Sequence, residues 1–224
     1  MRFWQQALEI ARVDLTVEQR VGSTLRITLP FAVVALIVFP LALGLQLGVV
    51  SAIGIGVYWA LGILFGMQVA LRQSAADSRD RRDLHTLLGV DPAARFAGRV
   101  ISGGVLMIGF LLVLLGAMTV LFDPSLPEGV WPVLLLSTLL VAIGLTELAT
   151  LAGEVTSGLS NRTVLASLIV APLALPLIIG ASQSVGALER DTSILPWILL
   201  LIASDLALAV AGVGLAQPLE EATR

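Results

Sequence analysis

Six long apolar runs constrain the fold of this chain of 224 residues more than any other feature. A bilayer core of about 30 Å requires about 20 mostly apolar residues per helix, and every run meets that length. The runs are Ile27 to Leu47, Val49 to Leu71, Val100 to Phe122, Trp131 to Ala152, Thr163 to Gln183 and Leu195 to Ala216. Open strands cannot satisfy their backbone groups in lipid, and the runs do not alternate as barrel strands do. The sequence therefore predicts an all-α integral membrane protein with six transmembrane helices.

The composition agrees with lipid as the main solvent. Hydrophobic residues make up 57% of the chain and charged residues 13%, whereas soluble domains are about 45–50% apolar and about 25% charged. There is no cysteine, which excludes disulfides and thiolate metal sites. The sequence shows no basic face, so we expect no nucleic-acid partner.

The arginines, which are the only basic residues besides one histidine, predict the orientation. Arg190 stands alone on one side of the six runs. The others fall on the opposite side and are Arg2, Arg12, Arg20, Arg26, Arg72, Arg79, Arg81, Arg82, Arg95, Arg99, Arg162 and Arg224. Because arginine accumulates in cytoplasmic loops, we expect a multi-pass membrane protein with both termini in the cytoplasm.

Residues 1–20 are predicted to form an amphipathic helix that precedes the membrane domain of residues 21–224. The apolar side chains at helical spacing are Phe3, Trp4, Ala7, Leu8, Ala11 and Leu15. Such a helix fits the cytoplasmic membrane interface, with Trp4 at headgroup depth. The alternative is a short helix docked on the protein's own loops.

The segment of about residues 72–98 is the one sizeable polar stretch between the runs. Leu84, Leu87 and Leu88 have helical spacing, and Asp91-Pro92 is typical of a helix start. We therefore expect two short helices, one ending near Leu88 and one opening near Pro92. A charged, structured loop of this kind is either a docking surface for a soluble partner or a solvated connector that fixes topology. The docking candidates are Asp80, Arg81, Arg82, Asp83, Leu84 and Leu87.

Catalytic motifs are missing from the sequence. The single histidine, His85, lies in the polar loop, and there is no HExxH, GxSxG or Walker A motif. We expect a non-catalytic protein that binds no cofactor directly. Glu147 and Asp205 fall inside predicted spans, where acids are costly and are functional candidates. The alternative is local solvation, of Glu147 by Thr146 or Thr150 and of Asp205 by Ser204.

Two prolines interrupt the fifth run. Pro172 and Pro176 each remove a backbone donor, so they predict a pronounced kink or an unwound turn near its middle. Such a break is either a packing kink or a flexible helix that lines a substrate path.

The proline segment resembles a known family. Pro172 to Ile179 (PLALPLII), preceded by Val155 to Ser167 (VTSGLSNRTVLAS), is similar to a stretch of haem exporter protein B, the CcmB family of cytochrome c maturation. The opening Phe3-Trp4 and the first-span stretch Ile37 to Leu41 (IVFPL) are similar too. Length, span number and inside termini match across the chain.

The resemblance implies the membrane subunit of an ABC transporter with ABC-2-type permease architecture in the bacterial inner membrane. Its ATP would be hydrolysed on a separate CcmA-like subunit, and the loop of about Asp77 to Leu88 would dock on it. CcmC- and CcmD-like subunits would handle haem, the possible substrate, for delivery to the periplasmic chaperone CcmE. Two ATPase subunits would also call for a second copy of this chain.

Three other hypotheses stay open on the sequence. One is an ABC-2-type exporter of a drug, lipid or glycan, which neighbouring genes would distinguish. Another is a secondary carrier that works without ATP through Glu147 or Asp205, which proton-driven flux would reveal. The last is a membrane scaffold without transport activity.

Overall fold

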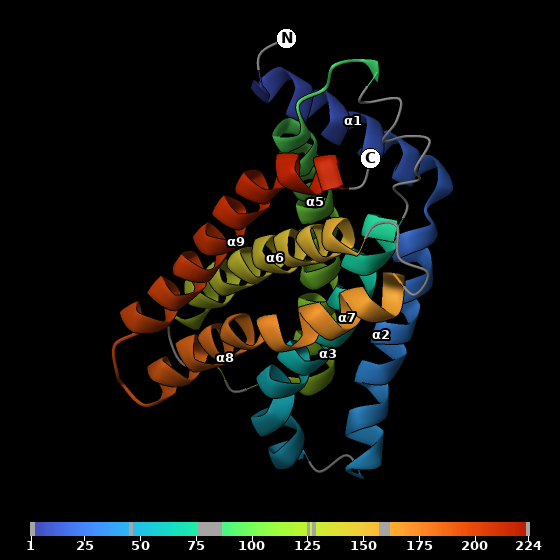
Figure 1. The fold of residues 1–224 in the computed structure, drawn as a ribbon. Helices are drawn as coiled ribbons and strands as arrows, with labels where there is room; N and C mark the ends of the chain where they lie inside the picture. Colours follow the sequence, from blue (N-terminus) through green and yellow to red (C-terminus); the bar gives the residue numbers. More distant parts are fainter. Residues whose placement is uncertain are drawn as a thin grey trace.

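The chain folds into a bundle of tilted helices, seen here in a computed structural model that describes residues 3–44, 47–75, 87–124, 126, 129–156 and 162–222 (Figure 1). The long elements in these ranges are all helical. They are α1 (Phe3–Val21), α2 (Ser23–Ala42), α3 (Leu47–Ala75), α5 (Pro92–Phe122), α6 (Val130–Val155), α7 (Arg162–Leu173), α8 (Leu175–Glu189) and α9 (Leu195–Ala222).

Five of these helices are individually long and apolar enough to cross a membrane, namely α2, α3, α5, α6 and α9. The helices α7 and α8 pass the same test together, as a pair bent by 40° at the break between them. The chain is thus a multi-pass membrane protein, and its described residues supply five candidate spans, or six if the bent pair is one span. The predicted fifth span, Thr163 to Gln183, is accordingly two helices.

Two predicted boundaries are wrong. The first span does not reach Leu47, because Gly44 adopts a left-handed conformation (φ 65°) that closes the end of α2, and Leu47 instead opens α3. The helix predicted to open near Pro92 is not short. With no further proline before Val100, it continues as the third span. Because α3 ends at Ala75 and α5 begins at Pro92, both ends of the predicted 72–98 loop are helical.

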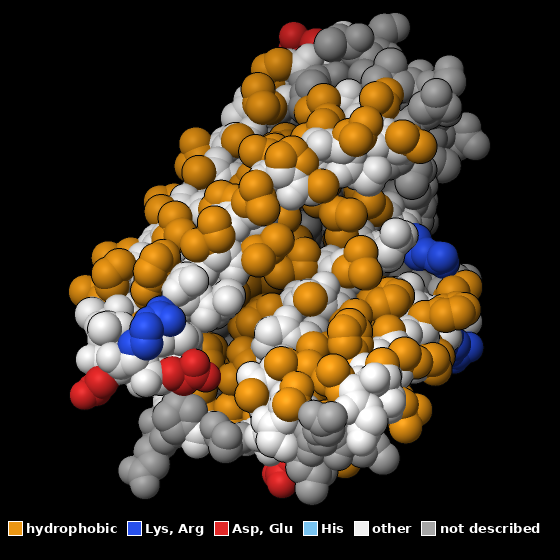
Figure 2. All heavy atoms as spheres, turned by 90° about the horizontal axis from the view of Figure 1, so that it is seen from below, with side chains coloured by type: hydrophobic (Ala, Val, Ile, Leu, Met, Phe, Trp, Pro, Cys, Tyr) orange, Lys and Arg blue, Asp and Glu red, His pale blue; other side chains and the backbone are white. Residues whose placement is uncertain are grey.

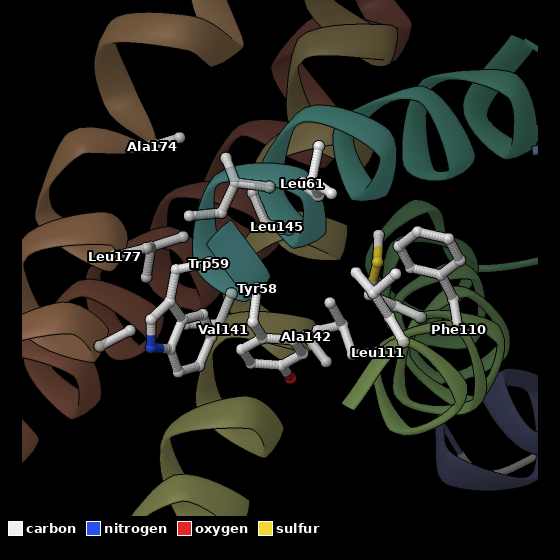
Figure 3. Packing of buried hydrophobic residues seen from close by; sticks show 14 of the residues in the cluster. Tyr58, Trp59, Leu61, Phe110, Leu111, Val141, Ala142, Leu145, Ala174 and Leu177 are labelled. Atoms are coloured by element: carbon white, nitrogen blue, oxygen red, sulfur yellow. The ribbon is translucent and has the colours of Figure 1, made fainter. Parts of the chain in front are cut away.

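The helix α6 forms the centre of the bundle. Of its apolar stretch 67% is buried, against 17% for α9 and 22% for α2. Figure 3 shows the packing around it, where side chains of α3, α5, α6 and α8 meet, among them Tyr58, Trp59, Leu111, Val141, Leu145 and Leu177. Hydrogen bonds between spans fix the register here. Tyr58 pairs with Thr138 (Oη to Oγ1, 2.9 Å), and Ser137 pairs with Ser184 (Oγ to Oγ, 2.8 Å).

The outside of the bundle is apolar. Exposed large side chains follow one face of α2 at helical spacing, from Ile27 through Phe31 and Val34 to Val38. Figure 2, which views the end of the molecule opposite α1, shows hydrophobic side chains over most of the surface and charged ones near its rim. An exposed apolar surface of this extent fits a protein solvated by lipid.

Candidate functional site

The first candidate site lies where α1 crosses the start of α5. The Asp91 side chain caps α5 by accepting a hydrogen bond from the Ala93 backbone N–H at 2.9 Å, and Pro92 occupies the first turn. The Asp91 backbone N–H donates in turn to Gln6 Oε1 of α1 at 3.2 Å. The sequence-based prediction of a helix start at Asp91-Pro92 is therefore confirmed, and the start is anchored to α1.

Close packing reinforces this anchor. A side chain at Gly98 would come within 2.6 Å of the Ala7 carbonyl oxygen and 2.9 Å of Ile10 Cβ, so the α1 and α5 backbones meet at this glycine. The neighbouring flank of α1 leaves Trp4 64% exposed, with Leu8 exposed beside it. The helix thus packs on the protein through one face and presents an apolar flank outward.

A buried charge cluster ties α5 to α6 at the same end. Arg95 and Arg99 stand one turn apart on α5, and their guanidinium groups lie 4.0 and 3.9 Å from Glu154 Oε1 at the end of α6. All three side chains are buried. Because breaking a buried ion pair strands a charge away from water, this cluster holds the two helix ends together.

The helix α9 joins this assembly through Gly212. A side chain there would overlap three atoms of the buried Phe96 ring of α5, so the ring lies directly against the α9 backbone. The first two turns of α5 therefore contact α1, α6 and α9.

Most of the predicted docking residues lie outside the described residues, namely Asp80, Arg81, Arg82, Asp83 and Leu84, as does His85. The predicted helix before Leu88 falls largely outside them too. Leu87 is described, and its side chain is 85% exposed just ahead of the Asp91 cap. The neighbouring Leu88 is exposed as well.

The break between α7 and α8 lies between the two prolines. Pro172 is in the last turn of α7, Ala174 separates the helices, and Pro176 is in the first turn of α8. Because Pro176 has no N–H, it cannot bond the carbonyl of Pro172 four residues earlier, and its ring pushes against that carbonyl. Bonds from Ala174 N to Val170 O and from Ile178 N to Ala174 O continue on either side, so the chain bends without unwinding further.

The two intramembrane acids lie near each other in the middle of the bundle. The Asp205 carboxylate of α9 rests on Gly144 of α6, and Glu147 follows Gly144 by one turn on the same helix. Leu177 of α8, in the turn after the proline break, contacts the same glycine. The structure thus brings together three features that the sequence presents separately.

The predicted local solvation of these acids is not observed. The hydroxyls of Thr146 and Thr150 donate to carbonyls of their own helix at 2.7 Å, and the Ser204 hydroxyl donates to Leu200 O at 2.8 Å. These hydroxyl hydrogens are therefore not available to the carboxylates.

The charge cluster is not among the predictions from the sequence, in which Arg95 and Arg99 indicate orientation only and Glu154 has no role. Two features of the sequence could have indicated the cluster. Arg95 and Arg99 are four residues apart, which places them on one face of the helix that opens at Pro92, and Glu154 follows the cytoplasmic end of the predicted fourth span.

Comparisons with known proteins match this chain along most of its length. A family model described as CcmB protein matches residues 5–220. Heme exporter protein B of Haemophilus influenzae is 28% identical over 180 residues, which cover 80% of this chain and 81% of that protein. Heme exporter protein B of Pseudomonas aeruginosa is 30% identical over 187 residues, which cover 81% of each.

Proposed function

Because the chain belongs to the CcmB family, we propose that it is the permease subunit of an ABC-type haem exporter in c-type cytochrome biogenesis. The family match over residues 5–220 carries this proposal, and the names of both relatives supply haem export. The sequence contains no Walker A motif, so ATP is hydrolysed on a separate CcmA-like subunit. This chain is then a transport subunit and not an enzyme.

The ATPase subunit docks on the segment that precedes α5, through Asp80 to Leu84 and Leu87. The exposure of Leu87 and the anchored start of α5 support this assignment. Closure of the ATPase would push the segment, and α5 would pass the movement to α6 through Glu154 and to α9 through Phe96. Rigid contacts at the start of α5 make this a mechanical coupling.

The membrane topology follows from treating the bent pair as one span. Six spans place both chain ends on one side, which agrees with α1 and the end of α9 lying at the same end of the bundle (Figure 1). The arginine distribution makes that side cytoplasmic in the inner membrane. The exposed Trp4 and Leu8 flank of α1 then lies in the interface.

The remaining partners are proposed from the family resemblance. CcmC- and CcmD-like subunits handle haem and deliver it to the periplasmic chaperone CcmE, and a second copy of this chain completes a two-fold arrangement over two ATPase subunits. Haem is the proposed substrate of the complex rather than a cofactor of this subunit.

Co-purification with the cognate ATPase subunit tests the docking step. We expect Arg81→Glu/Arg82→Glu to weaken binding about tenfold or more, because charge reversal turns attractive contacts into repulsive ones. Arg190→Glu is the matched control, since this exposed arginine is on the opposite side and should leave binding unchanged. Normal binding and normal ATPase coupling by the double reversal would show that this segment does not receive the ATPase.

A further inference from the structure

The buried acids of α6 and α9 are unusual in what surrounds them. Glu147 and Asp205 are 5% and 8% exposed. Among the described residues, Glu147 Oε2 and both Asp205 carboxylate oxygens have no hydrogen-bond partner. The Asp205 carboxylate rests on Gly144, so it is aimed at the face of α6 that carries Glu147 one turn later. Ionised oxygens without partners in such surroundings carry a large desolvation cost.

Positive charge does not offset this cost. Between their described ends α6, α8 and α9 contain no arginine. The helix α3 brings the Tyr58 hydroxyl, which pairs with Thr138, and Arg72, whose side chain is exposed at the last turn of the helix. On α5 the arginines are Arg95 and Arg99, at its first turns, where both face Glu154. Glu147 and Asp205 are thus two buried acids that these helices leave without a neighbouring cation.

We infer that Glu147 and Asp205 form a proton-binding site inside the bundle, in which at least one carboxyl group stays protonated at neutral pH. A proton on one carboxylate neutralises that buried charge and removes its repulsion from the other carboxylate, and it requires no further coordinating group. A metal cation needs more donors, and the described residues contain no group of three or more acidic, histidine or cysteine side chains that could hold one. This site goes beyond the proposed haem-export role and does not depend on it.

The location of the site gives the proton a mechanical consequence. Asp205 shares its contact on Gly144 with Leu177, which lies in the first turn of α8 directly after the proline break. Loss of the proton would place two like charges between α6 and α9, and would favour a wider separation of these helices. Because α8 packs against both, proton occupancy would bias the bend between α7 and α8.

Infrared spectroscopy of the full chain in lipid nanodiscs tests the inference. At neutral pH we expect a C=O stretching band of a protonated carboxyl group, and we expect it to be lost in Glu147→Gln/Asp205→Asn. Glu189→Gln removes an exposed acid by the same chemical change, so it is the matched control that should keep the band. A wild-type spectrum without the band, or a band retained by the double variant, would overturn the assignment.

A second measurement uses the unmodified chain, so it stands even if the double variant does not fold. An apolar carbodiimide reacts with protonated carboxyl groups in membranes, and mass spectrometry locates the adduct. We expect labelling at Glu147 or Asp205 at neutral pH that falls severalfold in alkaline buffer. Absence of labelling at both residues would contradict a proton site, and labelling blocked by added sodium or potassium would identify a cation site instead.

Discussion

Gly212→Ala tests whether α9 is held against the first turns of α5. The added Cβ would overlap three atoms of the Phe96 ring, and this ring is buried, so it has little room to move. Overpacking of this kind costs about 1–3 kcal/mol. The replacement of glycine by alanine inside a helix also gains about 1 kcal/mol of helix propensity. A control must separate these two contributions.

Gly214→Ala is that control, because nothing lies within 4 Å of a Cβ at Gly214 on the same helix. This variant gains the same helix propensity as Gly212→Ala, but its methyl group overlaps no other atom. The two alanine variants should therefore differ in free energy of unfolding by about 1–3 kcal/mol. For a chain of this size that difference corresponds to roughly 2–12 °C in Tm. Gly212→Ala should be the less stable variant.

Unfolding in detergent, followed by tryptophan fluorescence, measures the difference. Phe96→Leu should rescue Gly212→Ala in part, because a smaller and more flexible side chain can make room for the methyl group. If Gly212→Ala and Gly214→Ala have equal Tm values, Phe96 does not lie against α9 and the coupling of α5 to α9 is wrong.

Three further perturbations address the coupling. Glu154→Gln should lower the free energy of unfolding by about 3–5 kcal/mol, because it leaves two buried arginines without their carboxylate; a Tm equal to the wild type would refute the buried ion pairs. Leu87→Asp should change the free energy of unfolding by less than about 0.5 kcal/mol, since the side chain is exposed, and should weaken ATPase binding in a pull-down; unchanged binding would remove Leu87 from the docking surface. Pro176→Ala restores a backbone donor worth about 1 kcal/mol and should keep or raise Tm while c-type cytochrome assembly falls, as judged by haem staining; normal assembly would make the bend a packing feature only.

The spans could be predicted from sequence because their signal is local. A run of about twenty apolar residues can be recognised without knowing what packs against it, and the predicted spans agree with the apolar stretches of α3, α6 and α9 to within three residues at each end. The errors arose where one residue decides a boundary. Gly44 ends α2 through a left-handed conformation, and the Asp91-Pro92 cap starts a helix that nothing then stops before the third span.

The site was less predictable because its contacts join distant parts of the chain. The sequence identifies Glu147, Asp205 and the two prolines as unusual, but their convergence on Gly144 depends on how α6, α8 and α9 pack. Likewise, the burial of an arginine pair cannot be read from charge counts, since it requires Glu154 to reach the start of α5. Which faces of these helices meet is a tertiary property.

The central claim is that this chain is the permease subunit of a haem-delivery complex for c-type cytochromes. The most direct measurement is the amount of c-type cytochrome, together with the haem bound to the periplasmic chaperone, in a strain that lacks this gene. We predict that mature c-type cytochromes disappear, that the haem load of the chaperone changes, and that a plasmid copy of the gene restores both. Normal c-type cytochromes and a normal haem load in the deletion strain would contradict the account.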